Sequence, residues 1–147
     1  MIRFSINTLL SAALLALGSS GLAGDAVAVG YNKDGVWTAV TYYRSSTLKG
    51  AWDFKSEDEA KELALADVRK RSDYPVATAK ILDSSESSGF VAIARGQNRA
   101  GKDEIVVGRG KSQAEADQIA IARLNKSGAM RNQKIGYRYF SYGCNCK

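Results

Sequence analysis

The sequence predicts an α+β fold in which two ββαβ repeats form a mainly antiparallel sheet, packed by two helices with pseudo-two-fold symmetry. The first supporting observation is a duplicated helix, because KSEDEAKELALADV at residues 55–68 aligns without a gap to KSQAEADQIAIARL at residues 111–124. The second is a duplicated strand and turn, AVAVGYNKDG at residues 26–35 and AIARGQNRAG at residues 92–101. Two blocks that recur in the same order indicate an internal duplication. The alternative is two ordinary strand–helix segments with similar caps.

The first repeat covers residues 24–82 and is expected to contain three strands and one helix. Alternating β-branched and aromatic residues predict the strands, and Gly35 supplies the positive φ that a hairpin turn needs. Ser56 and Glu59 form the Ser-x-x-Glu pattern of a capping box, which predicts where the helix begins. The expected elements are Asp25–Tyr31, Val36–Arg44, a helix from Glu57 to about Arg71, and Val76–Leu82.

The second repeat covers residues 90–143 and follows a polar, Ser-rich linker, Asp83–Gly89. It repeats the capping-box pattern at Ser112 and Glu115. The first repeat is longer between its turn and its helix, and this insertion breaks the symmetry as a binding loop would. The expected elements are Phe90–Arg95, a turn at Asn98–Gly101, Glu104–Arg109, a helix at Gln113–Lys126, and Gln133–Tyr142.

Both predicted helices carry an Ala-rich apolar stripe at three- and four-residue spacing, which indicates one face turned toward a core. Because a hairpin with one helix buries little surface, the two repeats are expected to share a core within a single domain, residues 24–147. The stripes are Ala60, Leu63, Ala64 and Val68, and Ala116, Ile119, Ala120 and Leu124.

Residues 1–23 have the three-part pattern of a secretory signal peptide. A basic start at Arg3 precedes an apolar run from Phe4 to Leu17, and small residues lead to a cleavage site after Ala23. The alternative is a membrane anchor, but the run is shorter than the roughly 20 residues that a span needs. We therefore expect a periplasmic or secreted protein with no membrane span after cleavage.

The composition favours an anionic partner and disfavours metal or acid–base chemistry. The chain of 147 residues has a formal net charge of +6 and contains no His, which is the commonest general base and metal ligand. We therefore expect no cofactor and no metal site. The positive charge suits an acidic protein, an envelope polymer or a nucleic acid, although it also serves solubility alone.

The two cysteines, Cys144 and Cys146, are disulfide or redox candidates. In an exported protein they meet an oxidising compartment. A bond between residues two apart closes a strained and easily reduced ring, and the alternatives are a disulfide between two chains (a disulfide-linked dimer) or weak binding of a soft metal. Two thiols cannot by themselves complete a zinc site.

The second repeat resembles a known family of small exported bacterial domains of unknown function, the DUF4189 type. The similarity lies in the strand Ala92–Ala94, the turn at Gly101, the segment Gly108–Ser112 and the Ala-rich helix from Glu115. It covers the second repeat well and the first loosely. The resemblance implies an exported domain but brings no established activity with it.

The stretch GRGKSQAEADQIAIARL is also similar to the end of a double-stranded-RNA-binding domain, in which lysines at the start of the last helix hold phosphates. Here the corresponding positions include Glu115 and Asp117, whose charges would repel a phosphate backbone. We therefore expect no nucleic-acid partner.

The catalytic motifs suggested by single stretches of the sequence are incomplete. GRGKS lacks the first glycine of a phosphate-binding loop, since Ile105 stands at that position. The carboxylates between Glu57 and Glu62 belong to the opening turns of a helix, where they suit the helix dipole and face water. The sequence therefore predicts a protein that is not an enzyme, with a hydrolase as the less favoured alternative.

The best binding signal is a set of aromatic and basic residues near the insertion and in the last strand. Tyr, Trp and Arg are the residue types that anchor interfaces and stack on sugars. Strand aromatics are equally ordinary core residues, so both interpretations stay open. The candidate binding residues are Trp37, Tyr42, Tyr43, Arg44, Lys49, Trp52, Tyr137, Arg138 and Tyr139.

Together these features predict an exported, non-catalytic binding module. Its expected partner is another protein in the envelope or extracellular space, in an inhibitor or immunity-like role. The alternative partner is an anionic cell-envelope polymer, held by the basic and aromatic residues.

Overall fold

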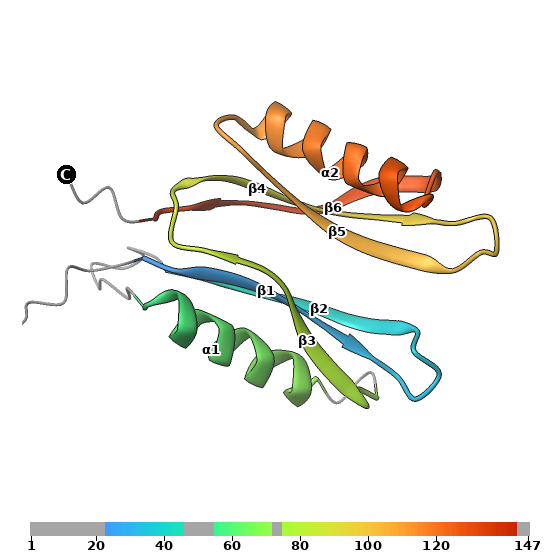
Figure 1. Ribbon diagram of the computed structural model, residues 1–147. Helices are drawn as coiled ribbons and strands as arrows, with labels where there is room; N and C mark the ends of the chain where they lie inside the picture. Colours follow the sequence, from blue (N-terminus) through green and yellow to red (C-terminus); the bar gives the residue numbers. More distant parts are fainter. Residues whose placement is uncertain (1–22, 46–54, 72–74, 144–147) are drawn as a thin grey trace, which may run out of the picture.

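The computed structural model describes residues 23–45, 55–71 and 75–143, which fold into six strands and two helices (Figure 1). All structural statements below concern these residues. In chain order the elements are β1 (Asp25–Tyr31), β2 (Trp37–Arg44), α1 (Glu57–Lys70), β3 (Thr78–Ser85), β4 (Gly89–Gln97), β5 (Asp103–Gly110), α2 (Gln113–Ser127) and β6 (Arg131–Ser141).

The strands form two antiparallel sheets, one from each repeat. Their strand orders are β2-β1-β3 and β5-β4-β6, so the first strand of each repeat is central in its own sheet. Figure 1 shows the two sheets facing each other, with α1 covering the outer face of one and α2 the outer face of the other. The α+β class and the ββαβ order of each repeat are thereby confirmed.

The division into two sheets differs from the single common sheet expected from the sequence. The reason lies in the central strands, which are apolar on both faces. In β1, Ala28 packs toward α1 whereas Val27 packs against the other sheet; in β4, Ala92 and Val91 divide in the same way. A strand that is apolar on both faces needs a cover on each side. Here the helix provides one cover and the opposite sheet provides the other.

Each helix packs its small residues tightly on its own sheet. Ala60, Ala64 and Val68 of α1 are buried, as are Ala116, Ala120 and Leu124 of α2. The approach is closest at Gly108 in β5, where an added Cβ would collide with the backbone oxygen of Ala116 and the nitrogen of Ala120. Glycine at this position therefore sets the distance between α2 and its sheet.

The duplicated turns and caps are nearly identical in the two repeats. Asn32 and Asn98 each accept backbone hydrogen bonds across their turns, and Gly35 and Gly101 have φ values of 74° and 76°. The expected capping box is complete in α1.

The cap of α2 departs from the expected capping box. Ser112 accepts from the Glu115 backbone N–H, as predicted. The Glu115 carboxylate, however, accepts from the N–H of Lys111, one residue before the N-cap, at 2.7 Å. The helix start was thus predicted correctly, but the reciprocal bond lies one residue earlier.

The expected linker is shorter than the sequence suggested. Strand β3 ends at Ser85 rather than Leu82, because residues 83–85 pair with the start of β1 at Asp25. The polar side chains in this part of β3 are therefore structural, and one of them, Asp83, takes part in the contacts between the sheets described below.

The close approach at Gly108 is testable by substitution. Gly108→Ala should destabilise the fold by about 1–3 kcal/mol or more, because the new methyl group meets backbone that cannot move aside. Gly136→Ala is the matched control, since a Cβ there meets only the Ile93 oxygen at an ordinary 3.7 Å. Urea unfolding of both variants measures the difference, and equal midpoints would contradict the packing described.

Candidate functional site

The space between the two sheets is filled by an apolar inter-sheet core. It receives alternate side chains from the facing strands, and its centre excludes water. Its buried members are Val27, Val91, Ile93, Val107 and Tyr139, with Val40, Leu82 and Ile105 partly buried beside them. Polar side chains occur at both ends of this core, and the two ends differ in character.

One end of the core is closed by a polar network centred on Asp25, whose side chain is 0 % exposed. Arg109 donates two hydrogen bonds to the Asp25 carboxylate, at 3.0 and 2.7 Å. The hydroxyls of Tyr139 and Ser141 donate to the same carboxylate at 2.6 and 2.7 Å. Asp25 belongs to the first repeat and its three partners to the second, so this network joins the two sheets directly.

The network holds Arg109 and Tyr139 in fixed protonation states. Burial opposes the charge of Arg109, but its hydrogen bonds and ion pair with Asp25, together with the charge of Asp83, raise the pKa of Arg109. Burial, followed by the negative charge of Asp25, raises the pKa of the Tyr139 hydroxyl. Arg109 therefore stays a cation and Tyr139 a neutral donor. Arg109 also donates to Asp83 at 2.5 Å, so its charge is shared by two carboxylates.

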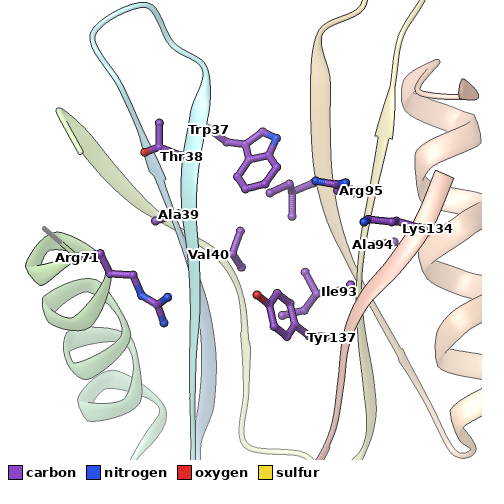
Figure 2. Close-up of a pocket in the computed structure, with 12 residues that line it drawn as sticks. Trp37, Thr38, Ala39, Val40, Arg71, Ile93, Ala94, Arg95, Lys134 and Tyr137 are labelled. Atoms are coloured by element: carbon purple, nitrogen blue, oxygen red, sulfur yellow. The ribbon is translucent and has the colours of Figure 1, made fainter. Parts of the chain in front are cut away.

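The other end of the core opens into a groove of about 560 Å³, which receives side chains from both repeats. In Figure 2 the Trp37 ring from β2 extends toward Arg95 of β4, and Tyr137 of β6 lies below them beside Ile93. Val40 and Ile105 add apolar surface. The groove thus combines an apolar interior with aromatic rings and charged side chains.

The charged side chains that line the groove are all positive. Arg95 and Lys134 stand directly opposite each other on β4 and β6, and Arg71 follows the end of α1. Within the described chain, Arg95 and Lys134 form no ion pair, and Arg71 has only a loose one, 3.9 Å from Asp67. No carboxylate is among the lining residues that the structure describes. Like charges directly opposite on neighbouring strands are destabilising, so this pair is costly to the fold by itself.

The indole nitrogen of Trp37 is buried at the groove without an acceptor among the described residues. A buried N–H that lacks a partner costs about 1–3 kcal/mol, and such groups are rare in native proteins. Trp37 also borders a second hollow of about 510 Å³, which mixes Lys80 and Lys102 with Asp103 and Glu104. The charges of that hollow are balanced, whereas those of the groove are not.

The structure brings together four of the predicted binding residues on the inter-sheet side. Trp37 and Tyr137 line the groove, and Tyr137 is 52 % exposed. Tyr42 stacks on Tyr139 with ring centroids 4.6 Å apart and lies 6.3 Å from Tyr137. Tyr139 itself is only 5 % exposed and belongs to the core, so the open choice between surface and core is decided for this residue in favour of core.

The other predicted binding residues lie elsewhere. Tyr43 packs against the core under α1, and Arg138 donates three hydrogen bonds to Asp117 of α2. Arg44 ends β2 beside Asp25 in the sheet register, at the opposite end of the strand from the groove. Lys49, Trp52, Cys144 and Cys146 lie outside the described residues.

Sequence reasoning missed the cations of the groove and the Asp25 network. One signal could have indicated Arg95. In the aligned repeats it occupies the place of Val29, and it interrupts the continuous apolar run of β4. Asp25 and Arg109 carried no comparable signal, because their contact joins residues far apart in the chain.

Comparisons with family models, with curated proteins and with solved structures returned no match for this chain. The resemblance to the DUF4189 type therefore stays a prediction. In the part of the chain that the structure describes, no helix is both long and apolar enough to cross a bilayer. The same residues contain no cluster of three or more potential metal-ligating side chains.

The Asp25 network should dominate the stability of the fold. Asp25→Asn should cost about 3–5 kcal/mol, because it leaves the Arg109 cation partly buried without its main counterion. Asp117→Asn is the control, since it breaks an equally direct but more exposed pair with Arg138 and should cost no more than about 1 kcal/mol. Chemical unfolding of both variants measures the loss in free energy of unfolding. Similar losses in the two variants would show that the burial of the Asp25 network does not add to stability.

The Tyr139 hydroxyl should make stability depend on pH in the alkaline range. Its pKa is raised in the folded state, whereas an unfolded tyrosine ionises near pH 10. Above about pH 10 the unfolded state releases this proton and the folded state does not, so the stability that Tyr139 contributes at neutral pH is progressively lost. Tyr139→Phe should therefore be less stable than the wild type at pH 7, with a gap that narrows by pH 11. Urea unfolding across this range would refute the assignment if the gap stayed constant.

Proposed function

We propose that this protein is an exported, non-catalytic binding module that holds a segment of another protein in the groove between its two sheets. The observation that carries the proposal is the lining of the groove, in which cations, the exposed ring of Tyr137 and the partly buried ring of Trp37 surround an apolar floor. Arginine and large aromatics are the residues that most often anchor protein interfaces. Export is expected from residues 1–23, and an inhibitor or immunity-like role suits a module that binds without reacting.

The arrangement of the groove suits a protein ligand in particular. Tyr137 is exposed at its mouth, and Val40 and Ile93 form an apolar surface deeper in. A protein segment that offers an apolar side chain beside an acidic one would match both features. The groove is also formed by both repeats, so a ligand bound there would contact two sheets that are already fixed to each other through Asp25, at little cost in ordering.

A second candidate is an anionic polymer of the cell envelope. The observation that favours it is the Arg95–Lys134 pair, whose adjacent positive charges would attract any polyanion. The apolar floor of the groove favours the protein ligand over this alternative, since a hydrated polymer would leave that floor without a partner.

Capture of a binding partner with matched variants tests the proposal. Mature protein should retain a single stoichiometric protein from an envelope extract of the source cells, and Tyr137→Ala should reduce the retained amount about tenfold or more, because interface tyrosines are frequent hot spots. Tyr142→Ala is the control, since Tyr142 is similarly exposed but lies outside the groove. Equal losses in both variants would place the interface elsewhere. Sedimentation with peptidoglycan and no captured protein would instead support the polymer.

A further inference from the structure

The charges on the inter-sheet side are unevenly distributed. At the Asp25 network, the carboxylates Asp25 and Asp83 of the first repeat both accept hydrogen bonds from Arg109 of the second. The described lining of the groove has three cations, Arg95 and Lys134 from the second repeat and Arg71 from the first, and no carboxylate. The neighbouring hollow holds cations and carboxylates in equal number. The imbalance in charge therefore lies within the groove.

The aligned positions of the first repeat show that this imbalance is not required by the fold. Val29 of β1 stands opposite Lys80 of β3, in the place where the second repeat has Arg95 opposite Lys134. Lys80 lies over the ring of Tyr31 at 5.0 Å, so its single charge is accommodated locally. The same scaffold thus tolerates an apolar residue where the second repeat places a repelling arginine. Residues that weaken a fold commonly serve function, and this motivates a binding role for Arg95.

The indole of Trp37 adds a third hydrogen-bond donor to the groove, beside Arg95 and Lys134. The Trp37 indole N–H is buried without an acceptor among the described residues, and Figure 2 shows the indole extending toward Arg95, with Lys134 beyond it. One oxyanion between these three groups would supply the acceptor that Trp37 lacks and the negative charge that Arg95 and Lys134 lack. Hydrogen bonds to a charged acceptor are also stronger than neutral ones.

We propose that the groove recognises a carboxylate on its ligand, held by Trp37, Arg95 and Lys134, within an acidic peptide segment that also carries a large apolar side chain. This proposal rests on the proposed function and specifies the ligand chemistry of the same site. The peptide is favoured over a sulfated or phosphorylated polymer because the groove is bounded by Val40, Ile93 and Ile105 and by the Tyr137 ring. A groove of about 560 Å³ accommodates a ligand the size of a few side chains.

The first test compares two blocked synthetic hexapeptides by isothermal titration calorimetry. One contains two glutamates flanked by phenylalanines, and its twin has glutamines in their place. The mature wild-type protein should bind the acidic peptide roughly tenfold more tightly than the neutral one, and this preference should shrink as salt is raised. Equal affinity for the two peptides would overturn the proposal. Binding of dextran sulfate without binding of the acidic peptide would also overturn it, in favour of a polymer.

Lys134→Gln separates a binding role from a structural one. Because it removes the like-charge contact with Arg95, the variant should unfold about 1–3 °C higher than the wild type in the absence of peptide. It should also bind the acidic peptide about fivefold more weakly. Lys126→Gln removes the same charge from the exposed last turn of α2, where it suits the helix dipole, so it should leave the affinity unchanged and should not raise stability. If Lys134→Gln lowered stability or left the affinity unchanged, the proposal would be wrong.

The indole N–H is tested by Trp37→Phe, which keeps an aromatic ring and removes the donor. The variant should lose about fivefold or more in affinity for the acidic peptide while its affinity for the neutral peptide stays unchanged. If this variant fails to fold, Trp52→Phe offers an independent measurement, because Trp37 is then the only tryptophan in the chain. The fluorescence emission of Trp37 should shift when the acidic peptide is added and not when the neutral one is added. The absence of a shift with the acidic peptide would show that the peptide does not contact Trp37.

These outcomes are distinct from those of the partner capture. If Tyr137→Ala abolished capture while the acidic and neutral peptides bound equally, the binding function would stand and the carboxylate recognition would fall. If the acidic peptide bound as expected while no protein was captured, the ligand chemistry would stand without the proposed partner.

Discussion

The buried carboxylate of Asp25 is the constraint on which the rest of the structure depends. It has no exposure to water and receives hydrogen bonds from Arg109, Tyr139 and Ser141, all from the opposite sheet. An uncompensated charge at this depth would be very costly, so the two sheets must meet with these donors in place. The facing strands are thereby fixed at one end of the inter-sheet core. The far end is left free to open into a groove.

The repeat-like arrangement explains how the two halves of the described chain form a common interior. Two similar ββαβ units each cover one face of a sheet with a helix, and each would expose an apolar opposite face if it stood alone. Packing these faces together forms the inter-sheet core. At the facing positions the two halves differ: the first carries Asp25 and Asp83, and the second carries Arg95 and Lys134. The described groove therefore takes its charge from side chains of both halves, with Arg71 added from the first.

The features that were predictable from the sequence are those set by neighbouring residues. The helix starting at Glu57, the cap at Ser112 and the turn at Gly35 follow from local patterns and agree with the structure. The separation into two sheets was not predictable in this way, since strand pairing depends on contacts between distant segments. The aromatic residues of the groove, Trp37 and Tyr137, were predictable from the sequence because their residue types are common at binding sites. Arg95 was indicated only by its taking the place of Val29 in the aligned repeats, and its pairing with Lys134 depends on the register of β4 and β6.

Amide hydrogen exchange on the wild type and on Asp25→Asn tests most directly whether the two repeats unfold as one cooperative unit. Under conditions where both proteins remain mostly folded, the variant should lose protection in β1 and β3 and, to a similar degree, in the central strand β4 and in β6 of the other repeat. Such shared loss would show that one interior supports both sheets. A loss of protection confined to the first repeat, with β4 and β6 unchanged, would show that each sheet is stable without the other and would contradict the account.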